Sequence, residues 1–281
     1  MSDLLRGASA ARALTERLAA ESAALRARGV MPTLAIVRVG ERDDDLAYER
    51  AARQRAAQCG VAARTVALPG DATQEALLHA LTALSGDARV HGILLLRPLP
   101  AHLDDAAACA AIAPEKDVDG VTRASMAALY AGEAGFAPCT AAACLALLRH
   151  GGVPLDGSRV VVVGRSGVVG RPAALLLLRE NATVTVAHSH TRALSEVCRE
   201  ADVLLVAAGR AGLIGAAHVH PGQVVVDVGI HAAPDGSLCG DVKFDEVAPI
   251  VGAITPVPGG VGALTTAILC QHVIQAAGGS A

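Results

Sequence analysis

Aromatic residues are almost absent from this sequence of 281 residues, which contains no tryptophan, two phenylalanines and two tyrosines. A core without large rings has to be packed from alanine, valine and leucine, so each aromatic side chain becomes a candidate for a specific role. Long apolar runs are absent too, since the stretches 141–148, 173–178 and 203–208 are far shorter than the ~20 residues of a membrane-spanning helix. The first residues, which include Asp3 and Arg6, lack the apolar core of a secretory signal. We therefore expect a soluble, cytoplasmic protein without a membrane partner.

An excess of positive charge is also lacking. The formal net charge is −3, which offers no basic surface for nucleic acid and predicts no such partner. The seven cysteines are odd in number and form no C-x-x-C pair, so we expect small buried residues and neither a disulfide framework nor a zinc site. Two histidine pairs, His188/His190 and His218/His220, have no nearby cysteine or acidic partners to complete a metal site. We predict that no metal is bound.

What the sequence does contain is a strand, a glycine turn and a helix in direct succession. Val160–Val163 is typical of a buried parallel strand, and Ala173–Arg179 of a helix, with Pro172 near its first turn. The start of such a helix presents free N–H groups and a positive dipole end, which favours a bound phosphate and hence a dinucleotide. The glycines between them are Gly164, Gly167 and Gly170. Their spacing departs from the standard G-x-G-x-x-G, so a turn that only lets the helix pack close to the strand is the alternative.

Strand and helix patterns alternate along both halves of the chain. The expected strands are 33–39, 61–68, 91–96, 160–163, 183–187, 203–207 and 224–228. The expected helices are 8–28, 46–58, 74–84, 103–112, 125–131, 141–150, 173–179 and 263–277. We expect an acidic turn at 41–45, a polar turn at 114–120 and a rigid Pro/Gly loop at 254–262. The βαβ order predicts an α/β protein, whose last helix packs back on the first domain and leaves a cleft between domains for ligands.

Seven short blocks occur in one order along the chain. They are Lys116–Gly120, Pro138–Thr140, Gly164–Pro172, His188–Thr191, Asp227–Ile230, Gly240–Val242 and Thr255–Gly262. In this order and spacing they resemble the methylenetetrahydrofolate dehydrogenase/cyclohydrolase (FolD-type) family over essentially the whole chain. The resemblance implies a two-domain α/β protomer that assembles as a homodimer. Residues 1–140 and 263–281 would form an N-terminal folate-binding catalytic domain, and residues 141–262 a Rossmann-like NAD(P)-binding domain.

The resemblance also implies roles for individual residues. Asp119 would hydrogen-bond the pterin of a tetrahydrofolate substrate and Tyr48 would stack on it, which makes them the candidate catalytic residues. Pro258, Gly259 and Gly260 would wall the same pocket. The cofactor would contact Gly164, Arg165, Ser166, Gly170, Ser189 and Ile230. Arg165 and Ser189 resemble residues that favour a 2′-phosphate, and a guanidinium beside the ribose would be unused by NAD, so we expect NADP rather than NAD.

Three polar positions of the family pattern hold other residues in this chain. The family's helix after the first strand spells S-x-x-Y-x-x-x-K. Here Tyr48 is present, but Asp45 occupies the serine position and Ala52 the lysine position. The spacing from Tyr48 to Gly60 is that of the family, so a gap does not restore the lysine. The family's apolar strand ends V-Q-L-P-L-P, and here Leu96 occupies the glutamine position. Two polar partners of the family are therefore apolar in this chain.

The two departures are expected to affect one reaction more than the other. The family transfers a hydride from a folate methylene bridge to nicotinamide and then hydrolyses the methenyl product. Hydride transfer mostly requires positioning. Hydrolysis requires a titratable group that moves protons, and losing a general acid or base typically costs ~10²–10⁴-fold in rate. We therefore predict an NADP-dependent methylenetetrahydrofolate dehydrogenase with weak or absent cyclohydrolase activity.

Three charged residues are possible substitutes for the lysine. Arg55 shares the helix face of Tyr48, while strand alternation turns Arg97 away from the side of Leu96. An arginine places a charge but does not shuttle protons near neutrality. Asp45 would act as a base only with a raised pKa. The alternative for all these charges is a solvated helix face.

Two other hypotheses stay open at this point. One is a non-catalytic relative that keeps folate or nucleotide binding for a regulatory or structural purpose. The other is an enzyme of altered specificity that acts on another one-carbon or pterin-like substrate. We favour the dehydrogenase because the cofactor loop is complete.

Overall fold

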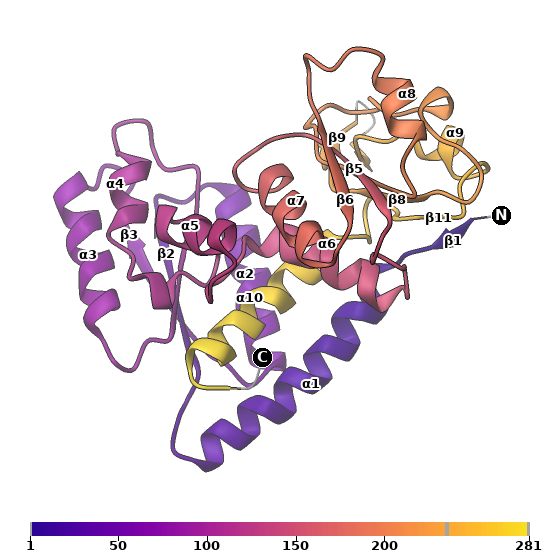
Figure 1. The fold of residues 1–281 in the computed structure, drawn as a ribbon. Coiled ribbons are helices and arrows are strands. Elements are labelled where there is room, and N and C mark those ends of the chain that lie inside the picture. Colours follow the sequence, from indigo (N-terminus) through magenta and orange to yellow (C-terminus); the bar gives the residue numbers. More distant parts are fainter. Residues whose placement is uncertain (1, 234–235, 280–281) are drawn as a thin grey trace. The chain divides into compact units, whose positions relative to one another are not determined.

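The computed structural model describes residues 2–233 and 236–279, which form two compact units (Figure 1). Residues 12–139 and 266–281 make up a unit with a three-stranded sheet, here the three-stranded unit. Residues 1–11 and 140–265 make up the six-stranded unit. The two-domain α/β fold expected from the sequence is confirmed. The predicted domain limits stay a prediction, and their residues 1, 234, 235, 280 and 281 lie outside the described part of the chain.

The three-stranded unit is built on a parallel sheet in the order β3–β2–β4. Its strands are β2 (Thr33–Val39), β3 (Ala62–Leu68) and β4 (Gly92–Leu95). Its helical segments are α1 (Gly7–Ala27, which begins in the other unit), α2 (Asp43–Gln58), α3 (Gln74–Gly86), α4 (Asp105–Ala110), η1 (Pro114–Lys116), α5 (Arg123–Ala131) and most of α10 (Gly262–Ala276). In the central strand, residues 34–37 are fully buried, as expected of a parallel strand covered on both faces. The last helix packs back on this unit, as predicted.

Helix α2 begins three residues earlier than the sequence analysis predicted. Asp43, Asp44 and Asp45 were expected in an acidic turn, and they form the first turn of the helix instead. Negative side chains at this position interact favourably with the positive end of the helix dipole. The turn prediction was therefore wrong for these three residues, because their charges stabilise a helix start.

The six-stranded unit contains a parallel sheet in the order β1–β11–β8–β7–β5–β6. Its strands are β1 (Asp3–Leu4), β5 (Arg159–Val163), β6 (Thr183–Ala187), β7 (Val203–Val206), β8 (Val224–Asp227) and β11 (Ala253–Ile254). A separate antiparallel hairpin joins β9 (His231–Ala232) to β10 (Leu238–Cys239). Its helical segments are α6 (Cys139–His150), α7 (Gly170–Arg179), α8 (Leu194–Arg199), η2 (Ala216–His218) and α9 (Phe244–Val247). The two-residue strands were not predicted, because they are too short to show a period.

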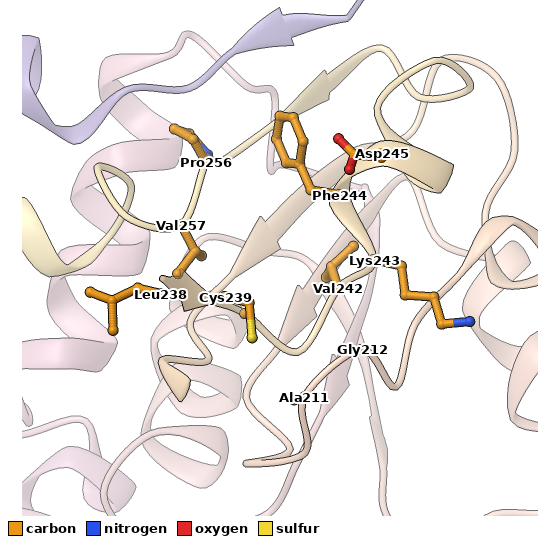
Figure 2. Close-up of a pocket in the computed structure, with 11 residues that line it drawn as sticks. Ala211, Gly212, Leu238, Cys239, Val242, Lys243, Phe244, Asp245, Pro256 and Val257 are labelled. Carbon is orange, nitrogen blue, oxygen red and sulfur yellow. The ribbon is translucent and has the colours of Figure 1, made fainter. Parts of the chain in front are cut away.

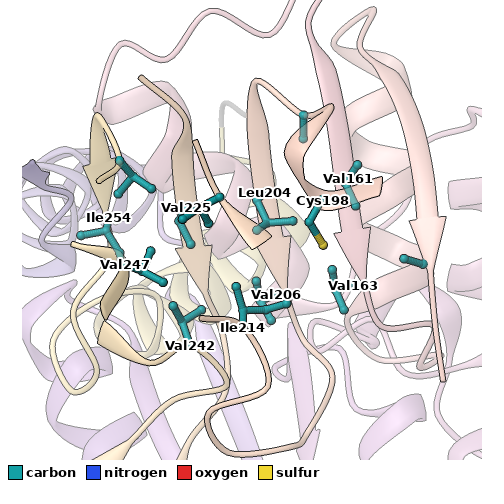
Figure 3. Close-up of a cluster of buried hydrophobic side chains, with 14 residues drawn as sticks. Val161, Val163, Cys198, Leu204, Val206, Ile214, Val225, Val242, Val247 and Ile254 are labelled. Atoms are coloured by element: carbon teal, nitrogen blue, oxygen red, sulfur yellow. The ribbon is translucent and has the colours of Figure 1, made fainter. Parts of the chain in front are cut away.

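The core of the six-stranded unit is aliphatic, as the lack of aromatic residues predicted. Alternate residues of neighbouring strands, such as Val161 and Val163 of β5 and Leu204 and Val206 of β7, point into one cluster (Figure 3). Six of the seven cysteines are buried and all seven are free, which confirms the expectation of small core residues except at the partly exposed Cys239. Among the described residues, no helix combines the length and the apolar composition needed to cross a membrane.

Candidate active site

The loop between β5 and α7 is shaped by two glycines whose surroundings leave no room for a side chain. Gly164 has φ +128°, and a Cβ there would overlap the carbonyl oxygen of Ala207. A Cβ on Gly170 would overlap the carbonyl oxygen of Gly164. At Gly167, in contrast, a Cβ would meet no described atom within 4 Å. Two of the three glycines therefore bring strand, loop and helix start close together, as both a phosphate-binding turn and a turn that only allows close packing require.

Ser166 closes this turn from within. Its hydroxyl oxygen accepts hydrogen bonds from the backbone N–H groups of Val169 at 3.1 Å and Gly170 at 3.3 Å. This serine therefore caps the start of α7. A direct contact of Ser166 with a cofactor stays a prediction.

A cavity of about 370 Å³ opens beside the loop, where β5, β6 and β7 end. It is lined by Gly164, by Arg165 after β5 and by Ser189 after β6, so the structure brings these predicted cofactor residues together. It is also lined by Arg210, which follows β7 and which sequence reasoning missed. Its position three residues beyond the end of the predicted strand 203–207, at the same sheet edge, was the available signal. Two guanidinium groups at one cavity can bind a phosphate through paired hydrogen bonds.

A second cavity, of about 330 Å³, is bordered by the end of β8 and by the Pro/Gly loop. Ile230, predicted to contact the cofactor, lines it with 62% of its surface exposed. Pro258, Gly259 and Gly260, predicted to contact the substrate, line the same space. These four predicted residues are therefore neighbours in the six-stranded unit.

The end of β8 is fixed by a buried carboxylate, Asp227, to which sequence reasoning gave no role. Its oxygens accept hydrogen bonds from the backbone N–H groups of Gly229 at 2.9 Å, Asp241 at 3.0 Å and Val242 at 3.0 Å. Burial raises the pKa of Asp227 to about 6, although these three hydrogen bonds oppose the shift. The carboxylate holds the strand end and the segment after β10 together beside the second cavity.

Asp241 extends this network to the hairpin. It accepts hydrogen bonds from the backbone N–H groups of Ala208 at 2.6 Å and Gly209 at 2.9 Å, and His231 Nε2 lies 2.7 Å from its Oδ1. Its carboxylate is fully buried. The blocks containing Asp227 and Asp241 were noticed in the sequence, but their joint role needed the fold, because the partners are up to 33 residues apart.

A third cavity, of about 560 Å³, shares Leu238, Pro256 and Val257 with the second (Figure 2). Lys243, on its border, pairs with Glu246 at 3.1 Å. The blocks Gly240–Val242 and Thr255–Gly262, noticed in the sequence, contribute residues to its lining, but sequence reasoning predicted no cavity there. Among the described residues, no group of three or more His, Cys, Asp or Glu side chains is placed to hold a metal ion.

The predicted pterin-stacking residue and the two departures from the family pattern lie in the three-stranded unit. Tyr48 is half-buried on α2. One turn later, Ala52 is 1% exposed, and Leu96, directly after β4, is 6% exposed. The positions where the family pattern has lysine and glutamine are therefore buried and apolar in this chain.

The solvated helix face considered for the nearby charges is wrong for two of them. Arg55 is half-buried, and its Nη1 donates to Thr15 Oγ1 at 2.9 Å. Asp45 is buried, and its Oδ2 lies 3.9 Å from Arg42 Nε. Both charges are held by neighbours that the local sequence pattern does not show.

The polar turn at 114–120 contains two carboxylates with different environments. Asp117 is fully buried and accepts hydrogen bonds from the N–H groups of Val121 at 3.1 Å and Thr122 at 2.8 Å and from Ser125 Oγ at 2.6 Å. The polar turn expected at 114–120 is therefore not solvated at Asp117. Asp119 is half-buried, and burial raises its pKa to about 6. Asp119 and Tyr48 thus belong to one unit, and the Pro/Gly loop to the other.

Comparison with known proteins agrees with this arrangement. Residues 5–119 match the model of the tetrahydrofolate dehydrogenase/cyclohydrolase catalytic domain, and residues 138–281 match that of the NAD(P)-binding domain of the same enzymes. The chain belongs to the tetrahydrofolate dehydrogenase/cyclohydrolase family. The resemblance found in the sequence is thereby confirmed, and with it an NAD(P)-binding Rossmann-like domain.

Relatives of this family match the chain over nearly its whole length. The bifunctional protein FolD of Carboxydothermus hydrogenoformans is 48% identical over 279 residues, covering 98% of this chain and 97% of that protein. A bifunctional FolD of Treponema pallidum is 49% identical over 283 residues, covering 98% and 90%.

Solved structures of the family match the fold as closely. That of the bifunctional FolD of Campylobacter jejuni has a TM-score of 0.96 at 36% identity and covers 99% of each chain. That of the Trypanosoma brucei FolD, complexed with NADP and an inhibitor, has a TM-score of 0.91 at 38% identity and covers 99% and 97%.

Proposed function

We propose that this protein oxidises 5,10-methylenetetrahydrofolate to 5,10-methenyltetrahydrofolate with NADP, and that its cyclohydrolase activity is weak or absent. In the first reaction the folate methylene carbon gives a hydride to nicotinamide, which is reduced. In the second, which we expect to be slow here, water attacks the methenyl carbon and a ring nitrogen gains a proton.

The observation that carries the proposal is the pair of buried apolar side chains, Ala52 and Leu96, in the lysine and glutamine positions of the family pattern. The sequence contains two lysines, and both have partners elsewhere. Lys116 Nζ donates to the carbonyl oxygens of Leu84 at 3.3 Å and Asp87 at 2.8 Å. Lys243 pairs with Glu246 in the six-stranded unit. Because both lysines already have partners, we propose that neither replaces the missing lysine in proton transfer.

Other titratable groups of the three-stranded unit do not replace an amine. Burial lowers the pKa of His272 to about 4, and its Nδ1 donates to the carbonyl oxygen of Val118 at 2.8 Å. Arg55 and Arg97 can place a positive charge, but a guanidinium group does not shuttle protons near neutrality. Asp119 titrates closer to neutrality, but we propose that it is occupied by the pterin.

The cofactor part of the proposal is supported by the cavity beside the glycine loop. Arg165 and Arg210 face a space that also takes in Ser189, which suits the 2′-phosphate of NADP better than the bare ribose of NAD. The Trypanosoma brucei relative was solved with NADP. We propose that Tyr48 stacks on the pterin and that Asp119 accepts its N–H groups, because the residues are present at the family's spacing.

Absorbance measurements test the proposal directly. Purified protein is mixed with methylenetetrahydrofolate and NADP, and NADPH formation is followed. In a separate sample, the decay of methenyltetrahydrofolate is followed with and without protein. We expect NADPH to form while the decay stays at its uncatalysed rate. Accelerated decay would refute the cyclohydrolase part, and absence of NADPH or NADH with either nucleotide would leave a non-catalytic or altered relative.

We also propose that the chain forms a homodimer, as the family resemblance implies. The edge strand β6 of the six-stranded sheet exposes Thr183, Thr185 and Val186. An uncovered strand edge can pair with another chain. Light scattering coupled to gel filtration tests this, and a monomer at micromolar concentration would contradict it.

A further inference from the structure

The loop after β7 carries Arg210 to the cavity beside the glycine loop, but it has few side chains that could anchor it. Residues 208–212 are Ala-Gly-Arg-Ala-Gly, and residues 208–211 are exposed. Gly209 has φ +67° and Gly212 has φ +62°, so the backbone is left-handed on both sides of Arg210. Exposed alanine and glycine bury little apolar surface, so packing contributes little to the shape of this loop. The position of Arg210 therefore depends on hydrogen bonds of the loop backbone.

Asp241, in the segment after β10, supplies three of these hydrogen bonds. Its Oδ2 accepts from the N–H groups of Ala208 at 2.6 Å and Gly209 at 2.9 Å. Its backbone carbonyl oxygen accepts from the N–H group of Ile214 at 3.0 Å. Asp241 therefore holds the beginning of the loop with its side chain and the end of the loop with its backbone.

The carboxylate of Asp241 is bonded in turn to His231 of the hairpin. His231 Nε2 lies 2.7 Å from Oδ1, the oxygen that does not face the loop. A carboxylate oxygen accepts hydrogen bonds, so the imidazole is the donor. The side chain of Asp241 is fully buried, whereas that of His231 is 24% exposed. Removing this donor would leave a buried carboxylate oxygen without the partner, which weakens the hold of Asp241 on the loop.

The surroundings leave Asp241 little freedom to find other partners. Its backbone N–H donates to Asp227 Oδ1 at 3.0 Å, which ties it to the end of β8. A Cβ on Gly229 would stand 2.5 Å from Asp241 Cγ and Oδ1, so the carboxylate fits closely against the backbone there. The direction of this side chain, toward the loop after β7, is therefore fixed by the fold.

We infer that Asp241, held by His231, is a positioning residue that places Arg210 to bind the 2′-phosphate of NADP together with Arg165. The cavity beside the glycine loop is lined by both arginines, whereas His231 and Asp241 are not among the described residues that line it. The pair therefore acts through the loop and not on the nucleotide. The inference rests on the proposed function, because the proposed cofactor supplies the phosphate.

The signature of this role is a loss of additivity between two substitutions. If His231 affects the nucleotide through Arg210, its removal matters only while Arg210 is present. We expect the affinity for a 2′-phosphorylated nucleotide to fall about threefold in His231→Leu and about fivefold in Arg210→Leu. The double variant is then expected to lose about fivefold, whereas independent effects would multiply to about fifteenfold.

Calorimetric titration with adenosine 2′,5′-bisphosphate measures these affinities without turnover. His231→Gln is the conservative variant, because its amide can place an N–H donor near the position of the ring Nε2. We expect it to bind the bisphosphate nearly as wild type does. His220→Leu is the matched control, since His220 Nε2 lies 3.1 Å from the carbonyl oxygen of Ala201, at the opposite edge of the sheet. It removes a comparable contact and is expected to leave the affinity unchanged.

Amide hydrogen exchange of the ligand-free protein tests the first step, from His231 to the loop. We expect the N–H groups of Ala208 and Gly209 to exchange about threefold faster or more in His231→Leu, and at the wild-type rate in His220→Leu and His231→Gln. Melting temperatures check folding. Should His231→Leu fail to fold, Asp241→Asn replaces it in the same cycle with Arg210→Leu. Its neutral oxygen holds the two N–H groups more weakly, so the same loss of additivity is expected.

The outcomes separate this inference from the proposed function. Affinity losses that multiply in the double variant, or unchanged exchange at Ala208 and Gly209, would overturn the inference while NADPH formation leaves the proposed function standing. The same holds for a wild-type protein that forms NADPH without binding the bisphosphate. A wild-type protein that neither binds the bisphosphate nor forms NADPH would overturn the proposed function, and the inference with it.

Discussion

The glycine loop of the six-stranded unit and the helix α2 of the three-stranded unit carry out their proposed tasks by different means. The shape of the loop depends on its backbone, since Gly164 and Gly170 leave no space for a Cβ. On α2, the family's hydrolysis depends on one side chain, the lysine. Ala52 occupies its position here, and the helix is still formed. A catalytic side chain can therefore be lost while the fold remains, whereas the loop cannot change Gly164 or Gly170 without losing its shape.

The same contrast explains why one of the two family activities is proposed to persist. Hydride transfer depends on the positions of folate and nicotinamide, and we propose that the glycine loop and Asp119 serve this positioning. Ring opening depends on a proton donor and acceptor of suitable pKa. The presence of Ala52 and Leu96 in place of the family's lysine and glutamine removes polar chemistry and leaves the surrounding backbone hydrogen bonds in place. At Leu96, for example, the N–H donates to the carbonyl oxygen of Val37 at 2.9 Å.

The largest expected effect comes from making α2 resemble its family again. Ala52→Lys combined with Leu96→Gln places an amine in a buried position, where desolvation lowers its pKa towards neutrality. We expect the rate of methenyltetrahydrofolate hydrolysis to rise by about 10²–10⁴-fold, measured by loss of methenyl absorbance.

A matched control adds a lysine to the same helix at an exposed position. Arg53, next to Ala52, is exposed and its Nη1 donates to Thr65 Oγ1 at 3.1 Å. Arg53→Lys is expected to leave hydrolysis unchanged. Should the double variant fold and still hydrolyse no faster than wild type, the missing amine is not the cause of slow hydrolysis.

The next prediction tests whether the loop requires a residue without a Cβ at Gly164. Gly164→Ala forces a Cβ against the carbonyl oxygen of Ala207 at φ +128°, so strand and loop must move apart. We expect dehydrogenase kcat/KM to fall by about 10²-fold, because displacements near 1 Å have costs of this order. Gly167→Ala, in open space among the described residues, is expected to stay within about twofold of wild type. Equal losses in both variants would contradict the assignment of the steric demand to Gly164.

The sequence predicted most of the long elements because they carry local patterns. Strand β2 was expected at 33–39 and lies at Thr33–Val39, since a run of apolar and β-branched residues between turns defines it. The strand β1 at Asp3–Leu4 was missed, because the strand it pairs with among the described residues, β11, is about 250 residues away in the chain. Pairing at such separation leaves no signal in a two-residue stretch.

In the candidate site, too, residues within local sequence motifs were predictable, and contacts between distant residues were not. The glycines, Arg165, Ser189 and Asp119 belong to contiguous motifs, so their positions could be read from spacing. The contacts of Asp241 with His231 and of Arg97 with Asp105 could not be read from spacing, because these residues become neighbours only through the fold. Strand alternation placed Arg97 relative to Leu96 but gave no information about the helix α4 that holds it.

The smallest of these effects sharpens the comparison within the six-stranded unit itself. Arg165 and Arg210 line one cavity, but only Arg165 belongs to the glycine loop. If Arg165 binds the 2′-phosphate of NADP, Arg165→Leu raises the KM for NADP about 10-fold and leaves the KM for NAD nearly unchanged, because a lost charge-assisted hydrogen bond costs about 1.5–3 kcal/mol. Initial rates with both nucleotides measure this. Arg210→Leu is the control, with a smaller change expected. If only Arg210→Leu lost the preference for NADP, the residue that binds the 2′-phosphate would be Arg210 and not Arg165. Cofactor specificity would then depend on a residue outside the recognised motif.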